Sequence, residues 1–280
     1  VLRAAAVGEN TLRAGEDVAQ GQNILAAGVK LRPAEIGGLM GLGLRQVDVV
    51  IPPRVAILSS GDEVVPPDRQ PQLGQVRDIN SYSLSALVQA HGGQPVRYGI
   101  VADRAEDLRN AAAQALAECQ VVVVTAGSSA SARDLTADVI RQMGAPGVLV
   151  HGVNVKPGKP SILAVCDGKA VIGLPGNPVS ALVIASLFVV PVVERLLGLP
   201  PDRPRPQMAA RLTINLASQA GREDWIPVRL LDAPQGGYLA EPIFFKSNLI
   251  FTLAQADGLL HIPADATGLA GGEPVRVLLL

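Results

Sequence analysis

The chain has 280 residues, of which 48% are hydrophobic and 18% charged, so its composition excludes a disordered chain and predicts about two folded domains. A balance of 24 Lys and Arg against 25 Asp and Glu, with 4 Phe, 3 Tyr and 1 Trp, argues against a nucleic-acid-binding surface. The only cysteines, Cys119 and Cys166, form no CxxC pair, which excludes a disulfide framework or a cysteine zinc site and predicts two core residues of a cytoplasmic protein.

Residues 1–52 are expected to form a partial N-terminal linker domain, because this segment is too short to build a core of its own. Its expected elements are a helix over 33–42, with Pro33 in the first turn, and a strand over 46–51. The chain begins with Val1 and has no apolar signal segment, and we expect it to be a piece of a longer protein.

Residues 53–203 alternate between strand and helix patterns, which predicts an α/β domain with a mostly parallel sheet covered by helices on both faces. The turn signal Asp167-Gly168 predicts a hairpin within this domain. The expected strands are 55–59, 96–101, 121–125, 148–151, 161–165 and 170–172, and the expected helices are 81–91, 105–118, 134–143 and 178–197.

Residues 170–193 carry no charge and are long enough to cross a bilayer. A Pro-Gly-Asn-Pro turn at 175–178 interrupts this stretch. We therefore expect a strand, a turn and a buried helix in place of a membrane span.

A proline-rich linker at 199–206 leads into residues 204–280, which we expect to form a small β-barrel. Its expected elements are strands over 208–216, 224–231, 236–242, 261–263 and 275–280 and a helix over 247–256.

Polar segments follow the predicted strands of the α/β domain, where ligands bind in parallel sheets. Taken singly, each is explained by an exposed turn, a helix cap or a solvated loop. Together they bring carboxylates, hydroxyls, amide-rich loops and two lysines to one edge of the sheet, which predicts a pocket for a phosphorylated ligand or an oxyanion, with carboxylates able to hold Mg²⁺. These segments are 59–63, 77–81, 125–134, 151–160 and 174–180.

The motifs in these segments resemble those of MoeA-type molybdopterin molybdenumtransferases and of the gephyrin E domain. The similarity continues at 10–17, 31–37, 246–248 and 256–259, so it covers nearly the whole chain and implies an N-terminally truncated member. The motifs are Ser-Gly-Asp-Glu at 60–63, Asp-Ile-Asn-Ser at 78–81, Thr-Ala-Gly at 125–127 before Arg133-Asp134, Lys-Pro-Gly-Lys-Pro at 156–160 and Leu-Pro-Gly-Asn-Pro-Val-Ser-Ala at 174–181.

The resemblance implies molybdenum cofactor biosynthesis: molybdate is inserted into the dithiolene of adenylylated molybdopterin (molybdopterin-AMP), with Mg²⁺, and AMP is released. It implies catalytic roles for Glu63 and Asp134 and metal ligation by Asp62, Glu63 and Asp134. The residues that it implies for binding molybdopterin-AMP and molybdate are Asp62, Asp78, Asn80, Ser81, Gly127, Ser128, Ser129, Ser131, Lys156, Lys159, Pro175 and Pro178.

The resemblance also implies a homodimer and the molybdopterin adenylyltransferase as a partner, without nucleic acid or membrane. One departure is the serine-rich loop 126–133, which lacks a family glycine and has Arg133 near a usually acidic or neutral position. This loop keeps a second hypothesis open, a non-catalytic sensor or scaffold that binds molybdopterin or an oxyanion. A variant that handles tungstate and the related adenylyltransferase are further alternatives, and the barrel and linker segments argue against the latter.

Overall fold

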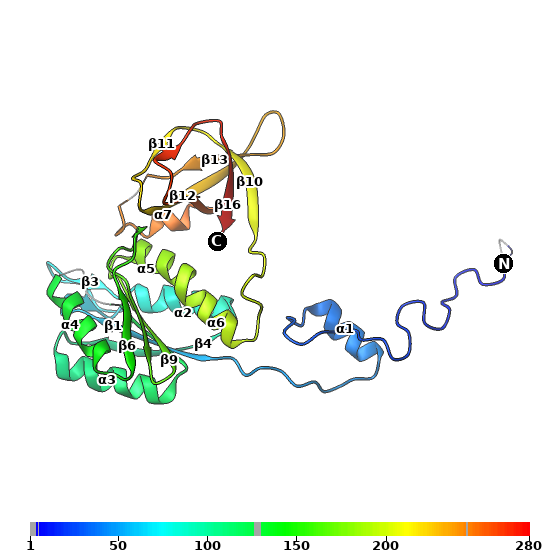
Figure 1. The fold of residues 1–280 in the computed structure, drawn as a ribbon, viewed down its shortest axis with the longest axis horizontal. Helices are drawn as coiled ribbons and strands as arrows, with labels where there is room; N and C mark the ends of the chain where they lie inside the picture. Colours follow the sequence, from blue (N-terminus) through cyan, green and yellow to red (C-terminus); the bar gives the residue numbers. More distant parts are fainter. Residues whose placement is uncertain (1–3, 5, 126–129, 245) are drawn as a thin grey trace. The chain divides into compact units, whose positions relative to one another are not determined.

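The computed structural model describes residues 4, 6–125, 130–244 and 246–280, and for residues 130–134 it describes the backbone alone. The chain divides into two compact units, Val1–Val49 and Val50–Leu280. The second unit holds both an α/β part and a β-barrel (Figure 1). The expected division into three domains, with boundaries after residues 52 and 203, stays a prediction.

The first unit contains one helix in its described part, α1 (Pro33–Gly41), close to the expected span. The helix begins with a capping box, in which the Arg32 backbone N–H donates to the Glu35 carboxylate at 2.8 Å. The Arg32 guanidinium beside it lowers the pKa of Glu35 to about 2. The strand expected over 46–51 was wrong: these residues have no ladder partner in the described chain, and an extended segment without a neighbour cannot form a sheet.

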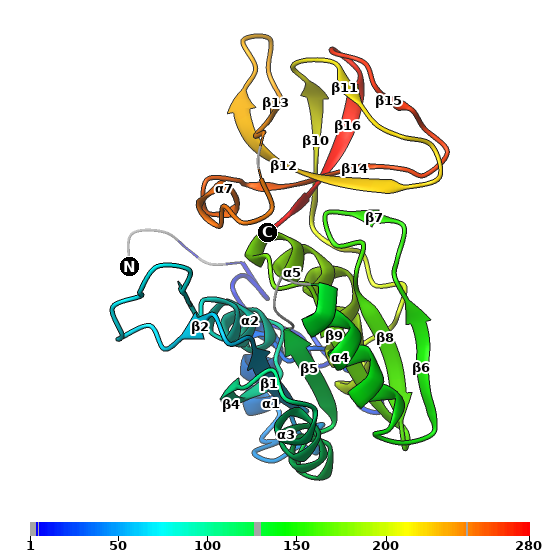
Figure 2. The ribbon, with the colours of Figure 1, turned by 90° about the vertical axis from the view of Figure 1, so that its left-hand side faces the viewer.

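The α/β part is built on a six-stranded sheet in the order β4-β1-β5-β9-β8-β6 (Figure 2). The first four strands are parallel, while β8 runs antiparallel between β9 and β6, so the sheet is mixed. The hairpin between β8 and β9 turns through Asp167 and Gly168 at positive φ, as this tight turn requires. The strands are β1 (Arg54–Ser60), β4 (Gln94–Val101), β5 (Val121–Thr125), β6 (Pro146–His151), β8 (Ile162–Cys166) and β9 (Lys169–Leu174).

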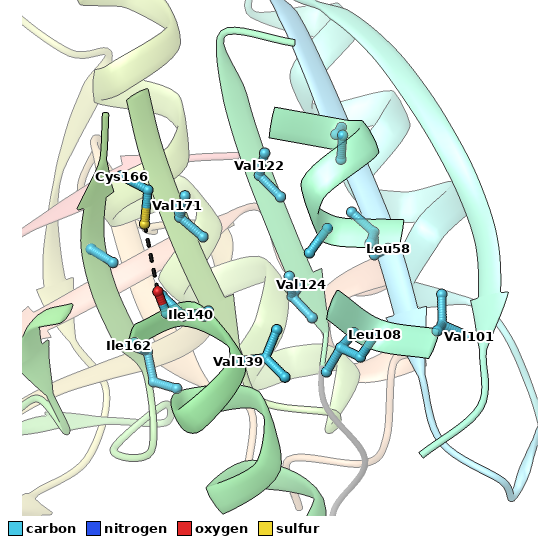
Figure 3. Close-up of a cluster of buried hydrophobic side chains, with 14 of the residues drawn as sticks. Leu58, Val101, Leu108, Val122, Val124, Val139, Ile140, Ile162, Cys166 and Val171 are labelled. Atoms are coloured by element: carbon cyan, nitrogen blue, oxygen red, sulfur yellow. Dashed lines mark hydrogen bonds between the residues drawn. The ribbon is translucent and has the colours of Figure 1, made fainter. Parts of the chain in front are cut away.

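Helices cover both faces of this sheet, as expected. On one face α3 and α4 pack on buried strand residues (Figure 3), and on the other α2 and the helix after β9 do so. Cys119 and Cys166 are both fully buried core residues, and burial raises the pKa of the Cys166 thiol. The helices are α2 (Asn80–Ala90), α3 (Ala105–Glu118), α4 (Ala130–Arg141), which begins four residues earlier than expected, α5 (Pro178–Ile184), the π-helical turn η1 (Ala185–Val189) and α6 (Val190–Leu196).

The helical stretch Pro178–Leu196 is long and apolar enough to cross a membrane by length and composition, and half of its most apolar window is buried in the protein. Its residues Ala181, Ile184 and Val193 belong to the core on the sheet face. A core helix passes the same test of composition, so this stretch carries no argument for a membrane span.

The C-terminal part is a closed five-stranded barrel in the order β13-β10-β16-β14-β12, with β12 pairing back to β13. The helix expected over 247–256 is reduced to one turn, α7 (Phe251–Ala254). The barrel strands are β10 (Gln207–Leu212), β12 (Glu223–Asp232), β13 (Tyr238–Pro242), β14 (Gly258–Ile262) and β16 (Pro274–Leu279), and the short pairs are β11 (Leu216–Ala217) with β15 (Gly268–Leu269) and β2 (Val64–Val65) with β3 (Val76–Arg77).

A short strand of the α/β part extends the barrel sheet. β7 (Val155–Lys156) lies beside the barrel (Figure 2) and pairs in parallel with β12. This pairing places Lys156 opposite Asp224. The backbone N–H of Glu223 also donates to the Asn154 carbonyl at 2.9 Å. The barrel therefore holds the loop that carries the two lysines of the Lys-Pro-Gly-Lys-Pro motif.

Candidate functional site

The strands that precede four of the five predicted site segments, β1, β5, β6 and β9, end together at one edge of the sheet. Ser59 at the end of β1 lies opposite Thr125 at the end of β5, and Thr125 lies opposite Leu174 at the end of β9. β4 ends beside β1, and β6 runs in the same direction as β9 on the far side of β8. The edge predicted from the sequence therefore gathers the segments that follow five different strands.

Acidic side chains lie close together where β1 and β4 end. The backbone N–H of Asp103 donates to Asp62 at 3.1 Å, and the Ser60 hydroxyl donates to the Asp103 carboxylate. Glu63 is half-buried, and its carboxylate covers Gly61. In the described part of the chain no set of three or more Asp, Glu, His or Cys residues is arranged to hold a metal. Asp62 and Asp103 thus offer two carboxylates, the number that Mg²⁺ commonly takes from a protein when a substrate phosphate supplies further oxygens.

Asp78 is buried and fixes the start of α2. Its carboxylate accepts the Ser59 hydroxyl at 3.0 Å, the Ser81 backbone N–H at 3.1 Å and the Ser81 hydroxyl at 2.6 Å. The negative charge of the Asp78 carboxylate thus complements the positive end of the α2 helix dipole from within the protein. Asp78 and Ser81 are therefore hydrogen-bonded to each other, which favours the capping interpretation for these two residues over direct contact with an anion.

Asn80 differs from its neighbours in having spare hydrogen-bonding capacity. Its amide N–H donates to the carbonyl of Gly176 at 2.8 Å, while its own Oδ1 is buried without a donor in the described chain. This bond ties α2 to the turn after β9. Asn80 is thus a positioning residue for that turn and holds an unused acceptor at the sheet edge.

The turn after β9 is also held from the barrel side. The Asn177 amide donates to the Ser247 hydroxyl at 3.0 Å, and the Val179 backbone N–H donates to the Ser247 carbonyl at 3.1 Å. Pro175 and Pro178 are buried and shape this turn. Separate hydrogen bonds therefore connect the end of β1 to the start of α2, α2 to this turn, and the turn to the barrel.

A cavity of about 540 Å³ lies between the α/β part and the barrel. The prolines that line it are Pro157 and Pro160, not the predicted Pro175 and Pro178. Its polar lining comes from three elements, the Lys-Pro-Gly-Lys-Pro loop, the first turn of α5 and the barrel. These polar and aromatic residues include Lys156, Lys159, Ser180, Asp224, Trp225 and Ser247.

The cavity has unneutralised positive charge. The side-chain ammonium groups of Lys156 and Lys159 have no ion-pair or hydrogen-bond partner among the residues described, and both residues are exposed. Ser180 is 4% exposed, and its hydroxyl makes no side-chain hydrogen bond to another described residue. The buried Asp224 carboxylate forms an ion pair with Arg222, whose guanidinium donates to it at 2.7 and 3.1 Å. Two free ammonium groups and the free hydroxyl of Ser180 are donors of the kind that an oxyanion needs.

Trp225 forms part of the barrel wall of this cavity. Its ring stacks on His261 with 4.5 Å between ring centroids, and His261 lies 3.2 Å from the Glu223 carboxylate. Its indole N–H is buried and has no acceptor in the described chain.

Five residues of the predicted site fall in or near the segment after β5. Gly127, Ser128 and Ser129 lie outside the described residues. Ser131 and Asp134 lie in the first turns of α4, where the backbone alone is described. The roles predicted for these five residues stay predictions.

The sequence analysis missed Asp103, Ser180, Trp225 and Ser247. The sequence pattern could have identified Asp103, because this residue follows the expected strand 96–101 as Asp62 follows β1. Ser180 was visible as the last polar residue of the turn segment. Trp225 and Ser247 line the cavity because the barrel packs on the α/β part, and the sequence around these two residues does not predict that packing.

Two family models match the chain in succession. Residues 56–195 match the probable molybdopterin binding domain, and residues 209–280 match the MoeA C-terminal region, domain IV. Both lie in the unit that contains the strand ends and the cavity.

The chain is similar over most of its length to longer proteins. It is 34% identical to a putative molybdopterin biosynthesis protein of Methanocaldococcus jannaschii, over 97% of this chain and 66% of that protein. It is 34% identical to a molybdopterin molybdenumtransferase of Nostoc over 93% and 60%, and 31% identical to molybdopterin molybdenumtransferase 2 of Mycobacterium tuberculosis over 99% and 69%. The chain thus spans less than two thirds of the first two relatives.

Solved structures share the fold. A crystal structure of a molybdopterin biosynthesis MoeA protein from Pyrococcus horikoshii superposes with a TM-score of 0.82 at 35% identity, over 95% of this chain and 64% of that one. A second from the same organism gives 0.81 at 29% identity, over 100% and 67%.

Proposed function

The chain belongs to the MoeA family of molybdopterin biosynthesis proteins, and on this premise we propose that it is part of a molybdopterin molybdenumtransferase. The proposed reaction inserts molybdate into the dithiolene of adenylylated molybdopterin and releases AMP. The observation that carries this proposal is the cavity lined by two lysines whose ammonium groups have no partner in the described chain.

The proposal divides the site by charge. Lys156 and Lys159, with the hydroxyls of Ser180 and Ser247, would bind molybdate, because fixed positive charge and hydroxyl donors suit a tetrahedral oxyanion. The polar residues at the sheet edge would bind molybdopterin-AMP. Asn80 bonds to Gly176 in the turn after β9, and the next residue of this turn, Asn177, bonds to Ser247 of the cavity.

Mg²⁺ is a further part of the proposal. Asp62 and Asp103, with Glu63 beside them, fit a cation that prefers oxygen ligands, and Asp134 is a fourth carboxylate by family resemblance. When bound, the ion would offset the negative charge of the phosphates of molybdopterin-AMP. Glu63 and Asp134 are proposed to handle protons during the reaction, since carboxylates can serve as general bases.

We also propose an oligomeric state, a partner and a compartment. The mostly exposed apolar residues of α1, of which Leu39 alone is buried, favour a homodimer that covers them. The molybdopterin adenylyltransferase is the proposed partner, because it makes the substrate. Two free cysteines favour the cytoplasm.

The decisive assay measures AMP released from adenylylated molybdopterin by the full-length protein, with and without molybdate and Mg²⁺. The transferase proposal predicts release that depends on molybdate. Binding of molybdate or molybdopterin without any AMP release would contradict it and support the sensor or scaffold hypothesis. Running tungstate in place of molybdate distinguishes the two metals.

A further inference from the structure

Asn177 occupies the N-cap position of α5, but its side chain does not cap the helix. Its backbone is extended, at φ −66° and ψ 124°, and its side chain makes no hydrogen bond to the first helical turn. An asparagine at an N-cap usually accepts a backbone N–H of that turn. Ser247 of the barrel supplies an acceptor there instead, because its carbonyl accepts the Val179 backbone N–H at 3.1 Å. The Asn177 side chain is therefore available for a different bond.

The Asn177 side chain bonds to the hydroxyl of the same barrel residue. Its amide Nδ2 donates to the Ser247 Oγ at 3.0 Å. An amide N–H can only donate, so the Ser247 oxygen is the acceptor of this bond. A serine hydroxyl also has one proton to donate, and the Ser247 proton has no acceptor among the described residues. The bond to Asn177 thus leaves Ser247 with a donor that the described protein does not use.

The cavity is where this donor can be used. Ser247 is half-buried and lines the cavity together with Lys156 and Lys159. The one carboxylate among the described lining residues belongs to Asp224, which is paired with Arg222 at 2.7 Å and does not compete for the hydroxyl proton. An oxyanion without protons, such as molybdate, offers only acceptors, which match a hydroxyl donor.

We propose that Asn177 is a positioning residue for the oxyanion site. Its amide holds the Ser247 oxygen as an acceptor, so that the hydroxyl proton is donated to the oxyanion in the cavity. The inference rests on the proposed function, since it requires that this cavity takes an oxyanion. Asn177 acts through Ser247 and does not contact the ligand. A hydroxyl whose direction is set before binding loses less freedom when the ligand arrives than one that rotates.

Asn177→Asp tests the direction of this hydrogen bond with little change in the shape of the side chain. A carboxylate can only accept, so Ser247 would donate to it and its proton would no longer be available to the ligand. The contact between the turn and the barrel is kept, and we expect an unchanged urea midpoint. A residue that only held the turn would tolerate this change, whereas a positioning residue would not.

The main readout is the molybdate affinity of the full-length protein, measured by calorimetry. We expect Ser247→Ala to weaken binding about tenfold, the loss typical of one hydrogen bond to a charged acceptor, and Asn177→Asp to weaken it further because it also adds charge. In the Ser247→Ala background the aspartate substitution should cost about tenfold less than in the wild type, because the donor that it removes is already absent.

Asn248→Asp is the matched control for the added charge. Asn248 is exposed, follows Ser247 in the chain and makes no side-chain hydrogen bond to a described residue. The variant therefore adds a negative charge beside Ser247 and leaves the Asn177 amide in place. We expect it to weaken molybdate binding by the same factor in the wild-type and Ser247→Ala backgrounds. Asn177→Ala is a second variant without charge, which decides the question if Asn177→Asp does not fold, and its loss of affinity should disappear in the Ser247→Ala background.

The outcomes separate this inference from the proposed function. Equal losses from Asn177→Asp in the two backgrounds, as for Asn248→Asp, would attribute its effect to charge alone and overturn the positioning role. Wild-type affinity in Asn177→Asp or in Ser247→Ala, or a loss in Asn177→Ala that persists without the Ser247 hydroxyl, would overturn it too. Each of these results leaves the lysines of the proposed site standing. Failure of molybdate to bind the wild-type protein would overturn the oxyanion site itself, and this inference with it.

Discussion

Gly158, at the centre of the Lys-Pro-Gly-Lys-Pro loop, provides the sharpest test of how the cavity is built. Its φ is +124°, in a region that side chains other than glycine rarely adopt. A Cβ at this position would lie 2.2 Å from a side-chain carbon of the fully buried Ile184 on α5. Gly158→Ala must therefore move either the lysine loop or the core helix.

Two costs add in this variant. Forcing a methyl group into a packed core costs about 1–3 kcal/mol, and the left-handed backbone costs alanine about 1–2 kcal/mol. We therefore expect Gly158→Ala to lower the free energy of unfolding by about 2–5 kcal/mol. Because Lys156 and Lys159 flank this residue, molybdate affinity should fall as well.

Gly152→Ala is the matched control in the same loop. Its φ is +91°, but the nearest atom to an added Cβ is the Lys159 carbonyl at an ordinary 3.6 Å, so only the backbone cost of about 1–2 kcal/mol applies. Urea unfolding followed by circular dichroism compares the two variants, and calorimetry compares their molybdate affinity. Equal stability of Gly158→Ala and Gly152→Ala would refute the close contact between the loop and α5.

Four further predictions concern charged residues. Lys156→Met should weaken molybdate binding about tenfold or more by calorimetry, with an unchanged urea midpoint, because its ammonium has no partner among the described residues to lose. Asp78→Ala should lower the free energy of unfolding by about 2–4 kcal/mol in urea titrations, since it leaves buried donors of Ser59 and Ser81 unpaired. Asp134→Ala should abolish AMP release and keep cooperative unfolding. The depressed pKa of Glu35 means that its contribution to the start of α1 is present above its unfolded pKa and is lost only as the pH falls through about 2; Arg32→Ala should return this pKa toward about 4.3 in a carboxyl NMR titration.

Each of these has an outcome that would contradict it. Wild-type molybdate affinity in Lys156→Met would remove this lysine from the site. An unchanged urea midpoint in Asp78→Ala would mean that its hydrogen bonds contribute nothing. Turnover in Asp134→Ala would exclude its catalytic role, and unfolding would contradict its place in a polar segment. A Glu35 pKa near 4.3 in the unmodified protein would exclude the Arg32 contact.

Local patterns were sufficient to predict the elements of the α/β part. The helix over 105–118 and the strand over 121–125 have the bounds of α3 and β5, because each has a clear hydrophobic period between polar boundaries. The edge of the sheet followed from the parallel order of the strands. The strand over 46–51 failed because a strand pattern needs a neighbouring strand, which the described chain does not supply.

Site residues that belong to one continuous motif could be predicted from the sequence, while residues that packing brings to the site could not. Lys156 and Lys159 line the cavity, but Trp225 and Ser247, which line it from the barrel, are far away in sequence. The pairing of β7 with β12 places Trp225, and hydrogen bonds to the turn after β9 place Ser247. Pro175 and Pro178 shape a turn instead of lining the cavity, a difference that depends on how the turn packs against the barrel.

The central claim is that the lysine loop and the barrel together enclose an oxyanion. Anomalous scattering from molybdenum in crystals of the full-length protein grown with molybdate tests it most directly. We predict one strong peak within the cavity, in contact with Lys156, Lys159 and Ser247. A fully occupied molybdate elsewhere, with this cavity empty, would contradict the account.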